Sequence, residues 1–218
     1  MRREELLDRL LSLVFPARCV MCGKVVEYDT LWCSCEIDQK SQIIMLGNRL
    51  ECTSSFVYDG AARDLVLRFK KERDLRTAHF IAEHILEEFS ANVNCDIIIP
   101  VPPKEGAQQK DHAYKISAEL AFLLNLPLCS AALGRTADSR IQHYLTREER
   151  MKNAKESYYA KQYPLKEKRV LLVDDIVTTG ATLLACTEML FLLGATEVKA
   201  VTFATTTEIR KEVIEVGT

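Results

Sequence analysis

The segment Val170–Thr182 constrains the fold of this chain more than any other. Its first four residues are an unbroken run of valine and leucine, which is typical of a strand buried on both faces. Asp174 and Asp175 come directly after this run. The turn-forming residues Thr178-Thr179-Gly180 then lead into a helix that we expect over 181–193. A buried strand that turns sharply into a helix is the repeating unit of an α/β fold.

The same alternation of strand and helix runs through the rest of the chain. Strands that alternate with helices imply a doubly wound, mainly parallel sheet, in which ligands bind beyond the carboxyl ends of the strands. The polar, weakly periodic segment 136–161 is interpreted as a long excursion from this core. We expect strands at 54–58, 96–101, 169–173 and 197–204, and helices at 61–71, 75–89, 112–125 and 181–193.

The two acids and the turn after them have the chemistry to hold a sugar phosphate. Neither carboxylate can be buried unpaired at reasonable cost, and vicinal ribose hydroxyls are suitable partners because each can donate to a carboxylate oxygen. Hydroxyls and N–H groups at a helix N-terminus favour an anion, and Gly180 would let the backbone approach it closely. The residues expected to contact the ribose and its 5′-phosphate are Asp174, Asp175, Val177, Thr178, Thr179, Gly180, Ala181 and Thr182.

The cysteines are concentrated near the start of the chain. Five of the eight lie within the first 52 residues, which favours a metal site over disulfides. Cys19 and Cys22 have the spacing at which two sulfurs reach one tetrahedral Zn²⁺. Cys33 and Cys35, with one residue between them, are a less usual second pair, and Cys52 is an alternative ligand that would leave one of them spare. We expect a structural site of four thiolates, against the alternative of reduced cysteines without metal.

Length, charge and hydropathy limit the class of protein further. At 218 residues the chain has room for one sizeable core and a small module, which we place at 54–218 and 1–53, with a short amphipathic helix at the start of the module. The net charge of −2 lacks the basic excess of a general nucleic-acid binder, so such contacts would be local. No apolar run reaches the roughly 20 residues that cross a bilayer, and we expect a cytoplasmic protein without a membrane span.

The segment Val170–Thr182 resembles the phosphoribosyl-pyrophosphate-binding motif of the type I phosphoribosyltransferases. In that family the two acids, here Asp174 and Asp175, are the catalytic pair that holds the ribose hydroxyls, and Mg²⁺ accompanies the pyrophosphate. Nearly the whole chain also resembles the ComF (ComFC, GntX-like) competence proteins. The features that carry this second resemblance are Phe15-Pro16 before Cys19-Val20-Met21-Cys22, then Tyr58-Asp59-Gly60, Phe69-Lys70, Ile99-Pro100-Val101-Pro102, and Gln142 through Asn153.

The ComF resemblance implies a zinc-ribbon-like module followed by a type I phosphoribosyltransferase-like domain. ComF-like chains carry a basic loop and an Arg-Gly-Phe-Asn-Gln box after their Pro-Val-Pro strand, and this chain departs from that box at 102–114. The segment 142–153 keeps the family spacing of Gln, Leu, Arg and Asn, and two interpretations are open: a mobile hood that closes over the ligand and excludes water, or an exposed polar helix. The candidates for contact with pyrophosphate or for the hood are Lys70, Lys104, Gln142, Arg147 and Arg150.

Three functions are compatible with these residues. The resemblance implies a competence protein that binds phosphoribosyl pyrophosphate or a 5′-phosphorylated nucleotide and aids the handling or import of single-stranded DNA in natural transformation, with a competence helicase or DNA-processing proteins as partners. Arg68–Lys71, Arg147–Lys152 and Tyr158-Tyr159 mix basic and aromatic residues as single-strand binders do. The alternatives are an active phosphoribosyltransferase (a pentosyltransferase) of nucleotide metabolism, for which no base pocket is recognisable, and a non-catalytic sensor of a phosphoribosyl ligand.

Overall fold

A five-stranded sheet is the centre of the part of the chain described by the computed structural model, which comprises residues 16–27, 30, 32–33, 41–72, 74–89, 94–103, 112–136 and 157–206. Four strands are mutually parallel and one edge strand is antiparallel to its neighbour, which confirms the mainly parallel α/β sheet. The strands, in spatial order, are β1 (Gln42–Leu46), β2 (Leu50–Val57), β7 (Glu197–Thr205), β6 (Arg169–Val177) and β3 (Ile97–Pro100).

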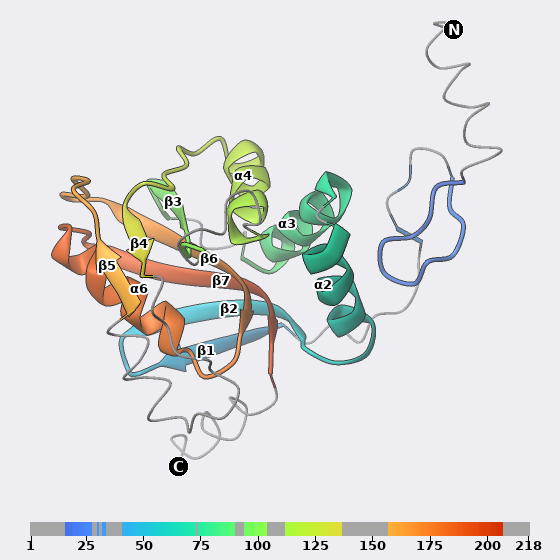
Figure 1. The fold of residues 1–218 in the computed structure, drawn as a ribbon, viewed down its shortest axis with the longest axis horizontal. Coiled ribbons are helices and arrows are strands. Elements are labelled where there is room, and N and C mark those ends of the chain that lie inside the picture. The colour runs from blue at the N-terminus through green and yellow to red at the C-terminus, as the bar shows by residue number, and fades with distance from the viewer. Residues whose placement is uncertain are drawn as a thin grey trace, which may run out of the picture.

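Helices cover both faces of this sheet, so the fold is doubly wound (Figure 1). Helices α2 (Gly60–Glu72), α3 (Leu75–Phe89) and α4 (His112–Leu124) pack on one face, and α6 (Ala181–Leu192) packs on the other. Beside α6 lies a second, two-stranded antiparallel sheet of β4 (Leu133–Arg135) and β5 (Tyr158–Ala160). The excursion that we expected over 136–161 therefore ends in a strand, because β5 pairs with β4, and its middle part lies outside the described residues.

Strand β6 is central to the fold: β7 and β3 flank it in the sheet, and hydrophobic clusters cover its apolar run on both faces. Val170 and Leu172 belong to the hydrophobic cluster beneath α6, whereas Leu171 and Val173 belong to the cluster beneath α3 and α4. All four side chains are buried, as expected when alternate residues point to two covered faces. The prediction of a central strand at this position is confirmed.

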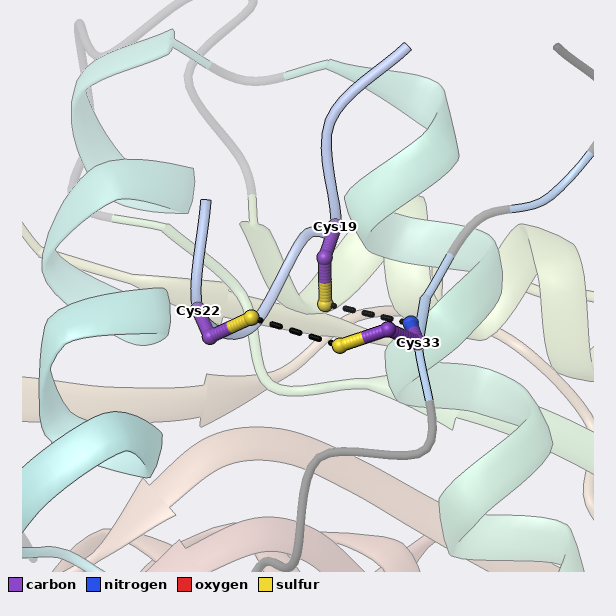
Figure 2. Close-up of side chains that lie close together, drawn as sticks. All are labelled: Cys19, Cys22 and Cys33. Carbon is purple, nitrogen blue, oxygen red and sulfur yellow. Dashed lines mark hydrogen bonds between the residues drawn. The ribbon is translucent and has the colours of Figure 1, made fainter. Parts of the chain in front are cut away.

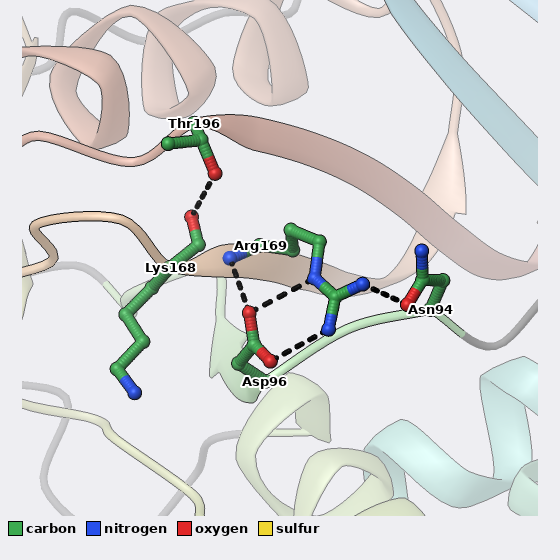
Figure 3. Close-up of polar contacts among 5 residues, drawn as sticks. All are labelled: Asn94, Asp96, Lys168, Arg169 and Thr196. Carbon is green, nitrogen blue, oxygen red and sulfur yellow. Dashed lines mark hydrogen bonds and ion pairs between the residues drawn. The ribbon is translucent and has the colours of Figure 1, made fainter.

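An ion pair holds β3 and β6 in register at their amino ends (Figure 3). The guanidinium of Arg169 donates from Nη2 to Asp96 Oδ1 at 2.8 Å and from Nε to Asp96 Oδ2 at 3.0 Å, and it also donates to the side-chain oxygen of Asn94. The Arg169 backbone N–H donates to Asp96 Oδ2 at 2.9 Å. Hydrogen bonds from Arg169 hold the pKa of Asp96 well below its usual range. Because the amino ends are aligned, the two strands reach the opposite edge at Pro100 and Val173.

The hairpin β1–β2 changes the division of the chain that we predicted. The strand expected at 54–58 begins at Leu50, and β1 before it was not anticipated. The turn between them has positive φ at Gly47 and Asn48, both 57°, and residues 42–53 pair within the main sheet. Residues 42–53 are therefore not part of the cysteine module, and we propose that the boundary lies before Gln42.

The cysteine module docks on α3 through shared hydrophobic packing. Cys19 and Met21 belong to the same buried cluster as Phe80 of α3. The indole of Trp32 meets the ring of Phe80 edge-on, with ring centroids 5.1 Å apart, and the ring of His84 at 5.6 Å. The module thus gains from the main domain the apolar contacts that so short a segment cannot supply alone. The helix expected within residues 1–15 lies outside the described residues.

Candidate functional site

The two acids lie in the second half of β6, three and two residues before its end at Val177. The strand runs to Val177, four residues further than we predicted, and Asp174 pairs with Thr202 of β7. On its other side β6 loses its neighbour at this point: β3 ends at Pro100, and the Val101 N–H donates to the Val173 carbonyl at 2.9 Å. The acids therefore stand at the carboxyl end of the sheet beside the strand that stops short, which is where α/β sheets bind ligands.

Asp175 faces α2, where it is paired with a lysine. Lys70 Nζ lies 2.8 Å from Asp175 Oδ2, and the Asp175 side chain is only 14% exposed. The Lys70 carbonyl lies 3.2 Å from His112 Nε2, and the His112 ring also meets the ring of Phe69 edge-on at 5.4 Å. The last turn of α2 is thereby held against the start of α4. This contact brings one predicted pyrophosphate residue, Lys70, to one predicted ribose residue.

Asp174 faces the opposite side of the sheet, beneath α6. Its negative charge adds to the effect of burial, which raises the pKa of the thiols of Cys52 and Cys186 and of the phenol of Tyr158. Burial raises the pKa of Cys52 to about 12, and the negative charge of Asp174 reinforces the shift. Asp174 Oδ1 also accepts the Asp175 backbone N–H at 2.9 Å. The two carboxylates thus leave the strand toward different faces, and a ligand held by both must lie across the strand end.

The turn before α6 is shaped by packing within the protein. Gly180 has a φ of 74°, and a Cβ atom at this position would lie 2.6 Å from Cδ2 of Leu46 in β1. The glycine is therefore required by its own backbone conformation and by the β1–β2 hairpin. The close approach of a ligand, for which we expected this glycine, stays a prediction. Thr179 Oγ1 accepts the Ala181 N–H at 3.4 Å, and the Thr178 carbonyl accepts the Thr206 hydroxyl at 3.5 Å. The Thr178 side chain is exposed.

Strand β5 borders the first turn of α6. Buried Tyr158 lies close to the Thr182 side chain, and the guanidinium carbon of Arg135 lies 5.3 Å from the Tyr158 ring centroid. Burial raises the pKa of Tyr158 to about 12, reinforced by Cys186 and opposed by Arg135. Thr182, predicted to contact phosphate, thus lies beside Tyr158. Arg135 was not anticipated as a neighbour of the site, and no pattern around it in the sequence marks it.

Three cysteines form a possible metal centre in the module (Figure 2). The sulfurs of Cys19, Cys22 and Cys33 all lie within 4.8 Å of one another, and Cys22 Sγ and Cys33 Sγ are 3.4 Å apart. The Cys33 backbone N–H points to Cys19 Sγ at 3.4 Å. Burial raises the pKa of Cys19, but hydrogen bonds from the backbone of Cys22, Cys33 and Met21 outweigh it and lower the pKa to about 6. A thiol that ionises this readily suits a zinc ligand, so the three residues could bind zinc.

The fourth zinc ligand is not among the candidates that the structure describes. Cys52 is buried in β2, where it pairs with Ala200, and it belongs to the cluster beneath α6. It is not a member of the sulfur group, because the β1–β2 hairpin carries it into the sheet. Cys35 lies outside the described residues.

The remaining predicted positions can be stated briefly. Val177 ends β6 and Ala181 begins α6, so both flank the turn at the strand end. Four pyrophosphate or hood candidates lie outside the described residues, namely Lys104, Gln142, Arg147 and Arg150. Within the described ranges, no helix combines the length and the apolar character needed to cross a membrane.

Comparison with known proteins assigns the part of the chain that contains the end of β6 to a family. The model of the phosphoribosyl transferase domain family matches residues 74–216, which include both acids and the turn. The chain belongs to the phosphoribosyltransferase domain family. The match begins just before α3 and excludes the cysteine module, so the family membership concerns the sheet domain.

Curated relatives extend the similarity toward the N-terminus. The chain is 24% identical over 191 residues to Competence protein F of Haemophilus influenzae, which covers 83% of this chain and 81% of the relative. It is 28% identical over 145 residues to Competence protein ComFC of Streptococcus pneumoniae, which covers 66% of this chain and 63% of the relative. With the family match, these similarities support the resemblance to ComF proteins and a ComF-type role.

Two solved structures match this chain over part of its length. Glutamine phosphoribosylpyrophosphate amidotransferase from B. subtilis matches with a TM-score of 0.42 and 20% identity, over 57% of this chain and 25% of that one. Adenine phosphoribosyltransferase from Thermoanaerobacter pseudethanolicus matches with a TM-score of 0.43 and 18% identity, over 65% of this chain and 76% of that one.

Proposed function

We propose that the carboxyl end of β6 and the turn before α6 bind the ribose and 5′-phosphate of phosphoribosyl pyrophosphate or of a nucleotide. The observation that carries this proposal is the pair of acids on opposite sides of a strand end that has lost one neighbour, directly before a helix N-terminus. Ribose hydroxyls that donate to both carboxylates would lie across the strand end. The 5′-phosphate would then lie at the turn, where Thr178 is exposed and the α6 dipole favours an anion.

Lys70 has a defined part in this proposal. Its ammonium group already neutralises Asp175, so it stands beside the position of the ribose. A pyrophosphate attached to that ribose would carry negative charge toward the same ammonium group, which attracts it. Mg²⁺ prefers oxygen ligands, and Asp174 and Asp175 would supply such oxygens to an ion that accompanies the pyrophosphate.

The physiological role that we propose is that of the ComF proteins. The names of the two relatives, Competence protein F and Competence protein ComFC, support a part in natural transformation. The chain would bind its phosphoribosyl ligand while it aids the handling or import of single-stranded DNA, together with a competence helicase or DNA-processing proteins. Zinc, held by Cys19, Cys22, Cys33 and a fourth thiolate, would stabilise the module, since four protein ligands leave no position open for chemistry.

A catalytic phosphoribosyltransferase is the second candidate, and the contact between Lys70 and Asp175 favours it. In that reaction an acceptor nucleophile forms a bond to C1 of the ribose while the bond from C1 to pyrophosphate breaks. Lys70 would stabilise the departing negative charge. A sensor that binds without reaction would use the same contacts, and release of pyrophosphate distinguishes the two.

Calorimetry with phosphoribosyl pyrophosphate tests the proposed site. The double variant Asp174→Asn with Asp175→Asn should abolish binding while the zinc content stays unchanged. Asp64→Asn, on the exposed surface of α2, is the matched control and should bind as the wild type does. Unaltered binding by the double variant would refute the assignment. Pyrophosphate release in the presence of purine and pyrimidine bases, absent in the double variant, would identify an enzyme.

A further inference from the structure

A cavity lies where the cysteine module meets α2 and α3. It has a volume of about 410 Å³, within the range of small-ligand sites. Residues 16–20 of the module, Arg68 of α2, and Asp74, Arg76 and Thr77 at the start of α3 line it. None of these residues belongs to the acids or the turn at the end of β6, so the cavity is separate from the proposed phosphoribosyl site.

Three arginines from three different segments, Arg18, Arg68 and Arg76, line this cavity. Arg18 Nη1 donates to the Gly23 carbonyl at 3.1 Å, and Arg76 Nη2 donates to the Thr30 carbonyl at 3.2 Å. Backbone carbonyls thus orient two of the guanidinium groups, and each guanidinium keeps further N–H donors. Among the residues that the structure describes, no salt bridge neutralises Arg18, Arg68 or Arg76.

Asp74, the one acid among the residues that line the cavity, accepts hydrogen bonds from the first turn of α3. Asp74 Oδ1 accepts the Thr77 backbone N–H at 2.9 Å, and Asp74 Oδ2 accepts the Thr77 hydroxyl at 2.5 Å. These are the contacts of a helix N-cap, so both oxygens serve the first turn of α3. The wall therefore presents three arginines and the positive end of the α3 dipole, with one aspartate to oppose them. In a chain of net charge −2, this is a local excess of positive charge.

We propose that this cavity binds a phosphate group, either free or in the backbone of a single-stranded nucleic acid. The planar guanidinium fork matches two phosphate oxygens at once, and three forks around one cavity favour such an anion. Arg18 directly precedes Cys19, so the cysteine centre holds one wall of the site in place. Arg68 and Lys70 stand two positions apart on α2, about 200° around the helix, so α2 presents one cation to this cavity and another to Asp175.

Binding of two probes to the full chain tests the proposal. Calorimetry measures inorganic phosphate, and fluorescence anisotropy measures a labelled oligothymidylate across a series of salt concentrations. The double variant Arg68→Gln with Arg76→Gln should lower the affinity for the probe that binds the cavity by about tenfold or more, since each arginine contributes charge-assisted hydrogen bonds. Arg49→Gln, an exposed arginine in the β1–β2 turn, is the matched control and should leave both affinities within about twofold.

The two sources of phosphate give different results. A strand phosphate requires that oligothymidylate binding weakens and that the slope of log K against log salt falls by about 0.7 for each arginine removed. A free phosphate requires that only inorganic phosphate binding weakens. Unchanged binding of both probes in the double variant, or an equal loss in Arg49→Gln, would overturn the proposal. The emission of Trp32, the single tryptophan, reports whether the module stays docked on α3 in each variant.

The phosphoribosyl site is tested independently. Asp174→Asn with Asp175→Asn should keep the binding of phosphate or oligothymidylate at the arginine cavity, and Arg68→Gln with Arg76→Gln should keep the binding of phosphoribosyl pyrophosphate. The failure of one proposal is therefore distinguishable from the failure of the other.

Discussion

The ammonium group of Lys70 at the end of α2 lies 2.8 Å from a carboxylate oxygen of Asp175, 105 residues later in the chain. The lysine side chain is 39% exposed and the aspartate side chain 14%, so the pair stands at the rim of the strand end with its acid turned inward. An exposed cation beside a recessed anion can neutralise a charged ligand that enters from solvent. The pair is thus the most direct link between α2 and the acids of β6.

Removal of this cation should weaken the phosphoribosyl site selectively. We expect Lys70→Ala to reduce the affinity for phosphoribosyl pyrophosphate by about tenfold, the size of one charge-assisted contact, and Lys70→Arg to restore part of it. Because the lysine is partly exposed, its loss should lower the free energy of unfolding by only about 1 kcal/mol or less. Calorimetry and urea unfolding measure the two effects. Lys71→Ala, its exposed neighbour, should change neither, and equal effects of the two variants would contradict the assignment.

Single cysteine variants should identify the zinc ligands. Cys19→Ser, Cys22→Ser, Cys33→Ser and Cys35→Ser should each lower the metal content from about one zinc per chain to about zero, because a structural site needs all four ligands. Cys52→Ala should keep its zinc, since that thiol lies in β2. Metal analysis of the purified variants gives the answer. Retention of zinc by Cys35→Ser, or its loss in Cys52→Ala, would require a different fourth ligand.

A methyl group at Gly180 should destabilise the turn before α6. The φ of 74° and the 2.6 Å approach to Leu46 Cδ2 together should cost about 1–3 kcal/mol in Gly180→Ala. Gly60→Ala is the matched control, because its φ of 43° is also positive but nothing lies within 4 Å of an added Cβ. Urea unfolding should show the larger loss for Gly180→Ala and partial recovery when Leu46→Ala is added. Equal losses at the two glycines would show that the contact with Leu46 contributes nothing.

The ion pair between Asp96 and Arg169 should make stability depend on pH in acid. Hydrogen bonds from Arg169 hold the folded pKa of Asp96 well below its usual range, so the unfolded chain takes up the proton first as pH falls. The contribution is therefore fully present above about pH 5 and is lost progressively as pH falls through the unfolded pKa of about 3.9 toward the folded value. Urea unfolding of the wild type and Asp96→Asn should show a stability gap that is constant from pH 5 to 8. The gap should narrow below about pH 4, and one that widens in acid would contradict this assignment.

The parts of the fold that the sequence predicted are those where burial leaves a simple pattern. Val170–Val173 is buried on both faces and reads as an apolar run, and α3 buries one stripe, so its bounds match the prediction at both ends. Strand β1 has no such pattern. As an edge strand it leaves Ile43 64% and Met45 52% exposed, so apolar residues occupy both faces and the alternation that marks a strand is absent.

The candidate site divides in the same way. The acids and the turn are contiguous in sequence, so local chemistry is enough to predict them together as a site. The pairing of Lys70 with Asp175, and the placement of Tyr158 against Thr182, depend on tertiary contacts between distant segments. The same is true of Arg18, Arg68 and Arg76, which meet only when the module docks on α2 and α3.

The contact between Leu46 and Gly180 affects how the phosphoribosyltransferase-family domain can be isolated. A truncated chain beginning at Ser54, the start suggested by sequence, would lack β1, half of β2 and the side chain that supports the turn before α6. Such a fragment would expose the edge of β7 and leave the turn before α6 without its support. Loss of ligand binding in that fragment would therefore reflect a missing hairpin, whatever the cysteine centre contributes.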